Sequence, residues 1–178
     1  MSKQSLVLKL LTVGDGGVGK TTLLHRYKED EFITNTQMTL GVAFVVQEVN
    51  IDGTMVMLQI WDFGGQEQFR FMLQRYALGA RGAVVMFDLT RLISLEHIEE
   101  WVNICRKDNP NLPLILVGTK LDLDEHIMVG DDLALEAKEQ YNLFDYIKAS
   151  SKTGEGVHET FSILARKIIE LEKAGQRR

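Results

Sequence analysis

Short apolar runs alternate with amphipathic stretches along the chain, and this pattern predicts strands alternating with helices. The runs predicted as strands are residues 6–13, 42–51, 55–61, 82–88, 114–118 and 146–149. Helical spacing of apolar residues follows from about residue 20, from 94, from 131 and from 161. Such alternation is typical of an α/β fold with a mostly parallel sheet that helices cover on both faces.

Local signals predict how several of these elements begin and end. Asp52-Gly53 between two apolar runs predicts a two-residue hairpin, so the flanking strands are expected to be antiparallel neighbours. Ser94 is predicted to cap a helix that ends near Asn109-Pro110, and Asp131 or Asp132 to cap the next one. The apolar residues expected on one buried face of the closing helix are Phe161, Leu164, Ile168 and Leu171.

The length of 178 residues predicts one domain over 1–178, with a core at about 6–171 and a fraying tail at 173–178. A net charge of −5 argues against binding to nucleic acid. The single cysteine, Cys105, excludes an internal disulfide, and its helical spacing favours a core position. With no signal peptide and no long apolar run, we expect a cytoplasmic protein.

The segment between the first strand and the first helix fits a phosphate-binding loop. Its sequence is Gly14-Asp15-Gly16-Gly17-Val18-Gly19-Lys20-Thr21, followed by Thr22. Glycines allow successive N–H groups to point at phosphate oxygens, and the helix dipole favours the same anion. Lys20 is predicted to reach the β- and γ-phosphates, and Thr21 to ligate Mg²⁺. The alternative is a glycine-rich turn without a ligand.

Polar residues at other strand ends predict the rest of a phosphate and metal site. Asp62 ends a strand and is expected to reach the magnesium shell, although an ordinary strand-end aspartate is the alternative. Gly64-Gly65 allows a close approach to a γ-phosphate, and Gln66 is suited to orienting a water molecule. Thr39 is either a second hydroxyl ligand for Mg²⁺ or an ordinary residue at the start of a strand.

The tetrapeptide Thr119-Lys120-Leu121-Asp122 follows another strand and is a candidate reader of guanine. A carboxylate at Asp122 accepts from both N1–H and the 2-amino group of guanine, whereas adenine lacks that amino group. Leaving a buried carboxylate unpaired disfavours the wrong base by as much as about 10⁴-fold. A solvated Lys-x-Asp loop is the alternative.

Together, these motifs closely resemble the Ras superfamily of small GTPases over about residues 6–171. The resemblance implies a three-layer P-loop NTPase fold, the G domain, with six strands, five of them parallel, and five helices. It also implies a molecular switch that binds GTP or GDP with Mg²⁺ and hydrolyses GTP slowly. Lys20 would stabilise phosphate charge, and Gln66 would position the attacking water.

Two segments, residues 39–44 and 150–157, resemble the Rab branch in particular. By position, Phe44, Trp61 and Tyr76 match a hydrophobic triad with which Rab proteins bind effectors, with plain core packing as the alternative. The resemblance also assigns base-binding residues outside the motifs above. These are Phe32 against the guanine face, opposite the Lys120 stem, and the Ser150-Ser151-Lys152 segment at the guanine carbonyl.

The chain departs from the Rab pattern at several positions. Phe63-Gly64 makes the segment after Asp62 more similar to the Arf branch, and Thr119 replaces an asparagine. Thr36 stands where many relatives have a tyrosine over the nucleotide. Gln37 stands where heterotrimeric G proteins carry an arginine, so we expect an activating protein to supply that charge.

The last residues, Ala174 to Arg178, lack the cysteines that are prenylated in Rab and Ras proteins. Either the sequence is cut short of its natural end or this member has no lipid, and no intrinsic lipid anchor is expected. With the unusual Phe63-Gly64, this suggests an archaeal or otherwise divergent relative. The expected partners are effectors, an exchange factor and an activating protein. Two other functions remain open: a metabolic P-loop phosphotransferase, and an interaction module that holds nucleotide without hydrolysing it.

Overall fold

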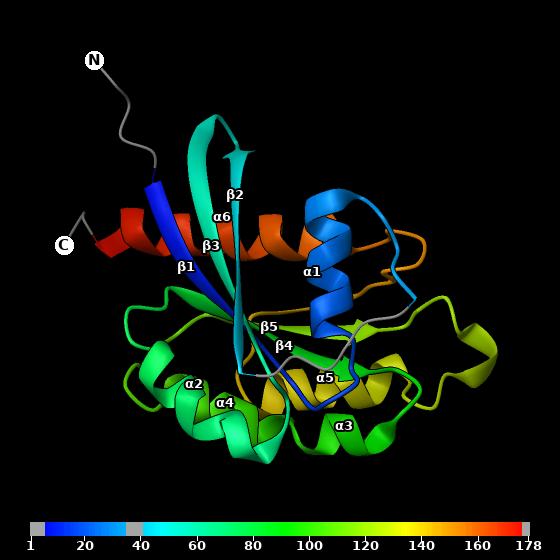
Figure 1. Cartoon of the computed structure of the whole chain (residues 1–178). Helices are drawn as coiled ribbons and strands as arrows, with labels where there is room; N and C mark the ends of the chain where they lie inside the picture. The colour runs from blue at the N-terminus through cyan, green and yellow to red at the C-terminus, as the bar shows by residue number, and fades with distance from the viewer. Residues whose placement is uncertain (1–5, 35–40, 176–178) are drawn as a thin grey trace.

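Six strands form one sheet in the order β2-β3-β1-β4-β5-β6 (Figure 1). The computed structural model describes residues 6–34 and 41–175. The strands are β1 (Leu6–Val13), β2 (Val42–Ile51), β3 (Thr54–Phe63), β4 (Gly82–Asp88), β5 (Leu114–Thr119) and β6 (Asp145–Lys148). β2 pairs with β3 in antiparallel register, and the other neighbouring pairs are parallel. The predicted α/β fold with a mostly parallel sheet is therefore confirmed.

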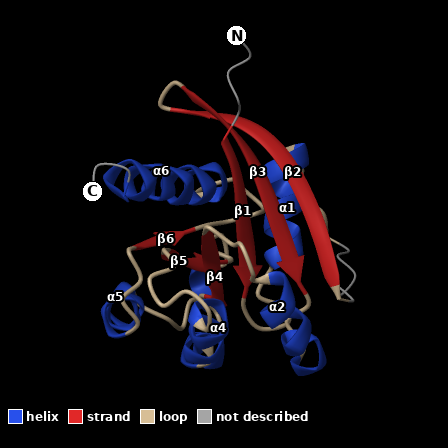
Figure 2. Ribbon diagram, turned by 90° about the vertical axis from the view of Figure 1, so that its left-hand side faces the viewer, coloured by secondary structure: helices blue, strands red, loops and turns tan. Residues whose placement is uncertain are grey.

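Helices cover both faces of this sheet (Figures 1 and 2). They are α1 (Lys20–Glu29), α2 (Arg70–Tyr76), α3 (Leu92–Glu96), α4 (Ile98–Arg106), α5 (Asp131–Gln140) and α6 (Val157–Gly175), with 3₁₀ turns at Glu67–Phe69 and Asp124–His126. α1 and α6 lie on one face, and the other four on the opposite face. Only His97 separates α3 from α4, and counting them as one interrupted helix gives the five helices that were expected.

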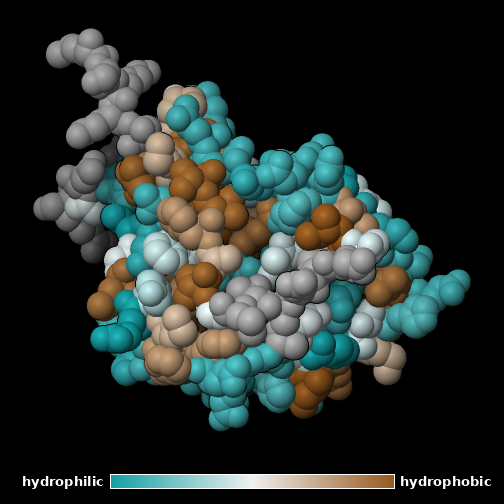
Figure 3. All heavy atoms as spheres, viewed as in Figure 1, coloured by the Kyte–Doolittle hydropathy of each residue, from teal (hydrophilic) through white to brown (hydrophobic). Residues whose placement is uncertain are grey.

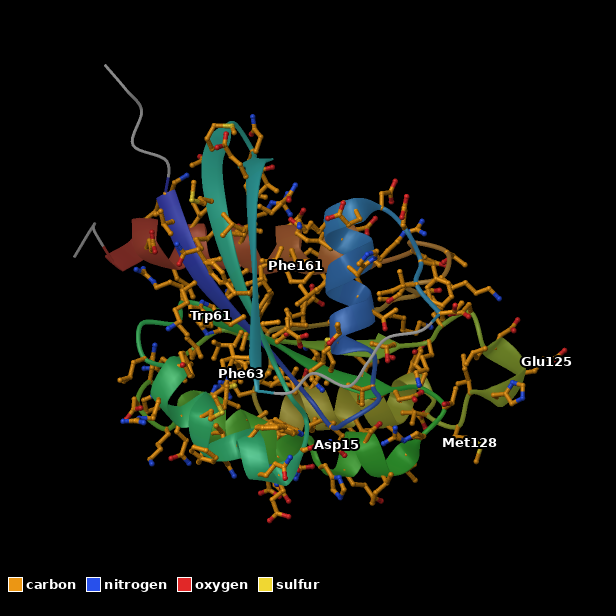
Figure 4. All side chains as sticks on the ribbon, viewed as in Figure 1. Asp15, Trp61, Phe63, Glu125, Met128 and Phe161 are labelled. Atoms are coloured by element: carbon orange, nitrogen blue, oxygen red, sulfur yellow. The ribbon has the colours of Figure 1, made fainter. Side chains whose placement is uncertain are left out.

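Each face of the sheet has its own hydrophobic core, because successive strand residues point to opposite sides. On the α1 and α6 side, Val84 of β4 packs in the same cluster as Phe161 of α6, which Figure 4 labels. On the other side, Val85 packs with Trp101 and Cys105 of α4. The core interpretation of Cys105 is thus confirmed, and burial raises the pKa of its thiol to about 12.

The hairpin between β2 and β3 has the predicted two-residue turn. Asp52 has a φ of 49° and Gly53 a φ of 84°, which are left-handed values that match the twist of an antiparallel pair. Ile51 pairs directly with Thr54 across the turn. This hairpin places β3, and Asp62 at its end, beside β1.

Some predicted helix ends are wrong. Ser94 is not an N-cap: α3 begins at Leu92, and the buried Ser94 hydroxyl donates to the Arg91 carbonyl within the first turn. The helix expected to end near Asn109-Pro110 ends three residues earlier, at Arg106. Leu171 is 45% exposed, whereas the other three residues of the predicted α6 face are buried, because the end of α6 lies at the rim of the molecule (Figure 1).

The parallel strands bring the polar residues that follow β1, β3, β4, β5 and β6 to one edge of the sheet, as expected for ligand sites in such folds. Within the residues that the structure describes, no helix has the length and hydrophobicity needed to span a membrane.

Candidate functional site

The glycine-rich loop runs from the end of β1 to α1 and lies directly against β4. A Cβ atom at Gly14 would fall 2.4 Å from the carbonyl oxygen of Met86, so only glycine allows this approach. Val18 contributes backbone alone, since its side chain is fully buried in the core on the α1 side. The loop is therefore held in place by β4 on one side and by the hydrophobic core on the α1 side.

Lys20, the first residue of α1, lies across this loop. Its Nζ donates to the carbonyl oxygens of Gly14 and Asp15, at 2.7 and 2.8 Å. Burial lowers the pKa of Lys20 to about 8, although the negative charges of Asp62 and Asp15 act in the opposite direction. An anionic ligand would restore the charge stabilisation that burial removes, which fits the predicted contact with phosphates.

Thr21 and Asp62 come together as the predicted metal site requires. The Thr21 hydroxyl donates to Oδ2 of the buried Asp62 carboxylate at 2.6 Å. Mg²⁺ prefers oxygen ligands and usually takes one or two from protein, with water and phosphate completing the octahedron. No cluster of three or more His, Cys, Asp or Glu residues suited to a metal occurs in the described part of the chain. The donor set thus fits a magnesium ion bound together with phosphates.

The segment after Asp62 packs on the glycine-rich loop. A Cβ atom at Gly65 would lie 2.4 Å from the backbone nitrogen of Gly16, so this glycine permits the contact. The N–H of Gly64 donates to the carbonyl of Gly41 at 2.9 Å, which connects this segment to the start of β2. Gln66 follows, half-buried, and its Oε1 accepts from the Gln68 side chain at 2.7 Å. Thr39 lies outside the described residues.

A cavity of about 440 Å³ extends from the loop toward the ends of β5 and β6. It is lined by Gly17, Thr22, Phe32, Ile33, Thr34, Thr119, Lys120, Asp122, Leu123, Ser151 and Lys152. Its volume lies in the range of small-molecule sites. The predicted base-binding residues except Ser150 line it directly, and the sequence analysis missed Ile33, Thr34 and Leu123, which carry no recognisable motif.

Two acidic residues organise the far end of this cavity. Oδ1 of Asp122 accepts from the Ser150 hydroxyl at 2.7 Å, so the buried Ser150 orients the carboxylate without lining the cavity. Nζ of Lys120 lies 2.8 Å from Oδ2 of the fully buried Asp88. Burial alone would raise the pKa of Asp88, but the bonds from Lys120 and Thr90 outweigh it and lower that pKa.

Thr119 connects the loop to the sheet. Its hydroxyl lies 2.6 Å from the carbonyl oxygen of Val18 and 3.0 Å from that of Phe87. Thr119 lines the cavity, but its hydroxyl is bound to backbone carbonyls. Its contribution is therefore to hold the loop and β4 together.

Asp15 uses its side chain in a way that the sequence analysis did not anticipate. Its carboxylate accepts from Nε1 of the buried Trp101 at 2.9 Å and lies 2.6 Å from Nδ1 of His97. The carboxylate therefore faces the α3–α4 side, and only the Asp15 backbone remains for a ligand. Arg91, also missed, donates from Nη1 to the Gly16 carbonyl at 3.3 Å.

This geometry defines a P-loop nucleotide-binding protein: a glycine-rich loop between strand and helix, a buried lysine, a hydroxyl–carboxylate pair for a metal, and a base-sized cavity. The sequence model of the Ras family matches residues 9–170. The chain belongs to the Ras family, whose members are small GTPases.

Individual relatives agree with this assignment. The chain is 37% identical over 164 residues to Ras-related protein Rab-19 of Xenopus laevis, covering 92% of this chain and 77% of the relative. It is 36% identical over 170 residues to Ras-related protein Rab-1 of Theileria parva, covering 94% and 77%. It is 37% identical over 164 residues to GTP-binding protein yptV2 of Volvox carteri, covering 92% and 76%. The chain is thus a Rab-like member of the family.

Proposed function

We propose that the cavity between the glycine-rich loop and the ends of β5 and β6 binds GTP or GDP, and that the chain is a switch that slowly hydrolyses GTP. The observation that carries this proposal is the convergence of two sets of residues on one cavity. Gly17 and Thr22, next to Lys20 and Thr21, line one end, and Asp122 lines the other. A nucleotide needs this arrangement, with phosphate groups at one end and a base at the other.

At the phosphate end, backbone N–H groups and Lys20 would neutralise the β- and γ-phosphates. Thr21 and Asp62, already in contact, would hold a magnesium ion, with Thr39 as a further proposed ligand. Mg²⁺, when bound, would add positive charge where negative charge develops on the phosphates. Gln66 would turn its amide from Gln68 to the attacking water, accepting from the water and donating to the phosphate.

At the base end, Asp122 would accept from N1–H and the 2-amino group of guanine. Ser150 donates to Oδ1 of this carboxylate, which fixes its orientation before the base arrives. Phe32 and the Lys120 stem line the same cavity and would cover the faces of the base, with the Ser151 and Lys152 backbone at its carbonyl. Preference for guanine over adenine follows from the carboxylate that adenine would leave unpaired.

The switch itself would act through the two segments joined by the Gly64–Gly41 hydrogen bond. A γ-phosphate would meet Gly65 and Thr39, and its loss would release both segments, as in other order–disorder switches. The Gly65 contact with the loop supports this assignment, because nothing larger than glycine fits there.

Effectors would read this change on the surface of β2, β3 and α2. Phe44 and Trp61 have ring centroids 4.9 Å apart, and Trp61 and Tyr76 5.3 Å apart. Phe44 is 50% exposed and Tyr76 38% exposed, so these rings form a surface cluster and not a core. Hydrophobic residues gather over this part of the molecule in Figure 3. An exchange factor and an arginine-supplying activating protein complete the proposed partners, in a cytoplasmic setting.

The direct test is to denature the purified protein, identify the nucleotide that is released, and then measure single-turnover GTP hydrolysis by the wild type and Gln66→Leu. We expect guanine nucleotide and a hydrolysis rate at least tenfold lower in the variant. Release of adenine nucleotide would contradict the proposal. Equal rates would remove Gln66 from the mechanism and favour a nucleotide-holding module. A requirement for an acceptor other than water would favour the phosphotransferase.

A further inference from the structure

Arg91 follows β4 and reaches the middle of the glycine-rich loop. Its Nη1 donates to the Gly16 carbonyl at 3.3 Å, and the same atom would lie 3.4 Å from a Cβ atom at Gly17. The Arg91 side chain therefore lies against the two loop residues that precede Val18, on a loop expected to hold phosphates.

The backbone that carries Arg91 is fixed on both sides. The Arg91 N–H donates to the Asp88 carbonyl at 2.9 Å, and the Arg91 carbonyl accepts from the Ser94 hydroxyl at 2.7 Å. Asp88 is itself held by Lys120. Because this backbone is fixed, only the Arg91 side chain has to move when a ligand arrives, which limits the reorganisation that charge stabilisation requires.

Arg91 forms no ion pair with a carboxylate in the described part of the chain. Other arginines of the protein do form such pairs: Arg70 with Glu100, Arg81 with Glu172, and Arg166 with Asp52. The effect of Arg91 extends to Lys20, because its positive charge adds to the lowering of the Lys20 pKa. An unneutralised guanidinium and a buried ammonium thus share one loop, and both favour an anion there.

Arg91 and the segment that carries Gln66 approach the same residue of the loop. Arg91 contacts the Gly16 carbonyl, and Gly65 packs against the Gly16 nitrogen. The three side chains with hydrolytic potential, Lys20, Gln66 and Arg91, therefore come from three elements that meet at residues 14–17.

We propose that Arg91 is a phosphate-contacting arginine supplied in cis, which stabilises the transition state of the intrinsic GTP hydrolysis that proceeds before an activating protein binds. The inference rests on the proposed function. Water attacks the γ-phosphorus, the bond from that phosphorus to the β–γ bridging oxygen breaks, and the bonding electrons leave with GDP while the water proton passes to the phosphate released. Turning from the Gly16 carbonyl toward the bridging oxygen, the guanidinium neutralises the charge that develops there.

The experiment is single-turnover hydrolysis of bound GTP, with Mg²⁺ and no added protein partner. The variants are Arg91→Ala, Arg91→Gln and Arg91→Lys, with Arg81→Ala as the control because Arg81 pairs with Glu172 outside the site. We expect the two neutral variants to hydrolyse GTP about 20-fold more slowly, the span between switches with and without an arginine in cis. Arg91→Lys should be intermediate, and the affinities for GTP and GDP should change less than threefold.

A second readout is the trapping of GDP with aluminium fluoride, which imitates the phosphoryl group in transit. The wild type should form a stable complex with GDP and aluminium fluoride in the absence of an activating protein, and Arg91→Gln should not. Equal hydrolysis and trapping by the wild type and both neutral variants would overturn the proposal, and so would an equal loss of GTP and GDP affinity with an unchanged rate. If Gln66→Leu still slows hydrolysis in that case, the proposed function stands and the arginine inference alone fails.

Discussion

Three carboxylates at the carboxyl edge of the sheet each hold a partner that the site needs. Asp62 accepts from Thr21 at the metal end, Asp88 pairs with Lys120, and Asp122 accepts from Ser150. Two of the three, Asp62 and Asp122, could be predicted from motifs. Asp88 could not be predicted, because a single aspartate at a strand end has no distinguishing pattern. Its partner, Lys120, is also 32 residues later in the sequence (120 − 88).

At this scale, the Thr119 hydroxyl is predicted to stabilise the loop. Thr119→Val keeps the shape but leaves the carbonyls of Val18 and Phe87 without this donor. We expect the free energy of unfolding to fall by about 1 kcal/mol in urea titrations, and bound GDP to dissociate faster. Thr119→Ser keeps the hydroxyl and serves as the control. Equal stability and equal GDP release in the two variants would show that the hydroxyl does not matter.

Asp88 predicts a specific dependence of stability on pH. Its folded pKa lies below the usual 3.8, so its ionised form stabilises the fold above that pH, and the contribution is lost as pH falls through the lowered pKa. With saturating GDP, Asp88→Asn should be less stable at pH 6 by roughly 2 kcal/mol and should lose less further stability between pH 6 and pH 3 than the wild type. The control is Asp108→Asn, an exposed position. A decline in Asp88→Asn as steep as in the wild type would contradict this role.

At the scale of elements, apolar runs predicted the strands well, because the inner strands are buried on both faces and the edge strand β2 is still rich in apolar residues although it is half exposed. The observed bounds of β1, β2 and β4 coincide with the predicted runs. Helix ends were less predictable, since Ser94 satisfies a cap pattern but bonds within the first turn of α3. The contacts of Asp15 with His97 and Trp101 span 82 and 86 residues, and only tertiary packing brings such residues together.

The contact between α4 and the glycine-rich loop gives an element-scale prediction. Trp101→Phe removes the N–H that Asp15 accepts, leaving a buried carboxylate oxygen without that donor. We expect a loss of about 2 kcal/mol in unfolding free energy and a weaker affinity for GDP.

Trp61→Phe is a matched control for this prediction. Trp61 also lies under a cation, Lys9, as Trp101 lies under Arg70. Its Nε1, however, has no hydrogen-bond partner among the described residues, so the same substitution should cost less than 1 kcal/mol. Equal losses in the two variants would mean that the indole bond to Asp15 contributes little.

On the scale of the whole molecule, one sheet edge collects the glycine-rich loop, the proposed metal pair and the proposed base-binding residues, with one cavity running between the loop and the ends of β5 and β6. Because β3, β1, β4 and β5 run parallel, a motif after β3 and a motif after β5 reach the same edge of the sheet although the two strands are not neighbours. The order of motifs could be predicted from sequence. How each motif is supported, by Thr119, Asp88 or Trp101, depends on packing between distant elements and needed the structure.

The central claim is that Asp122 selects guanine in this cavity. The most direct test is to substitute Asp122 and to measure which nucleotide base each protein then prefers. In Asp122→Asn, Oδ1 can still accept a hydrogen bond from Ser150, and the side-chain NH₂ then faces the base. This NH₂ can donate to the 2-carbonyl of xanthine, whereas it meets another donor in the 2-amino group of guanine. The affinities of the wild type and of Asp122→Asn should be measured for GDP, ADP and xanthosine diphosphate (XDP). We predict that the wild type prefers GDP by at least about 10³-fold and that the variant prefers XDP. A wild type that binds ADP as well as GDP, or a variant that still prefers GDP, would contradict the account.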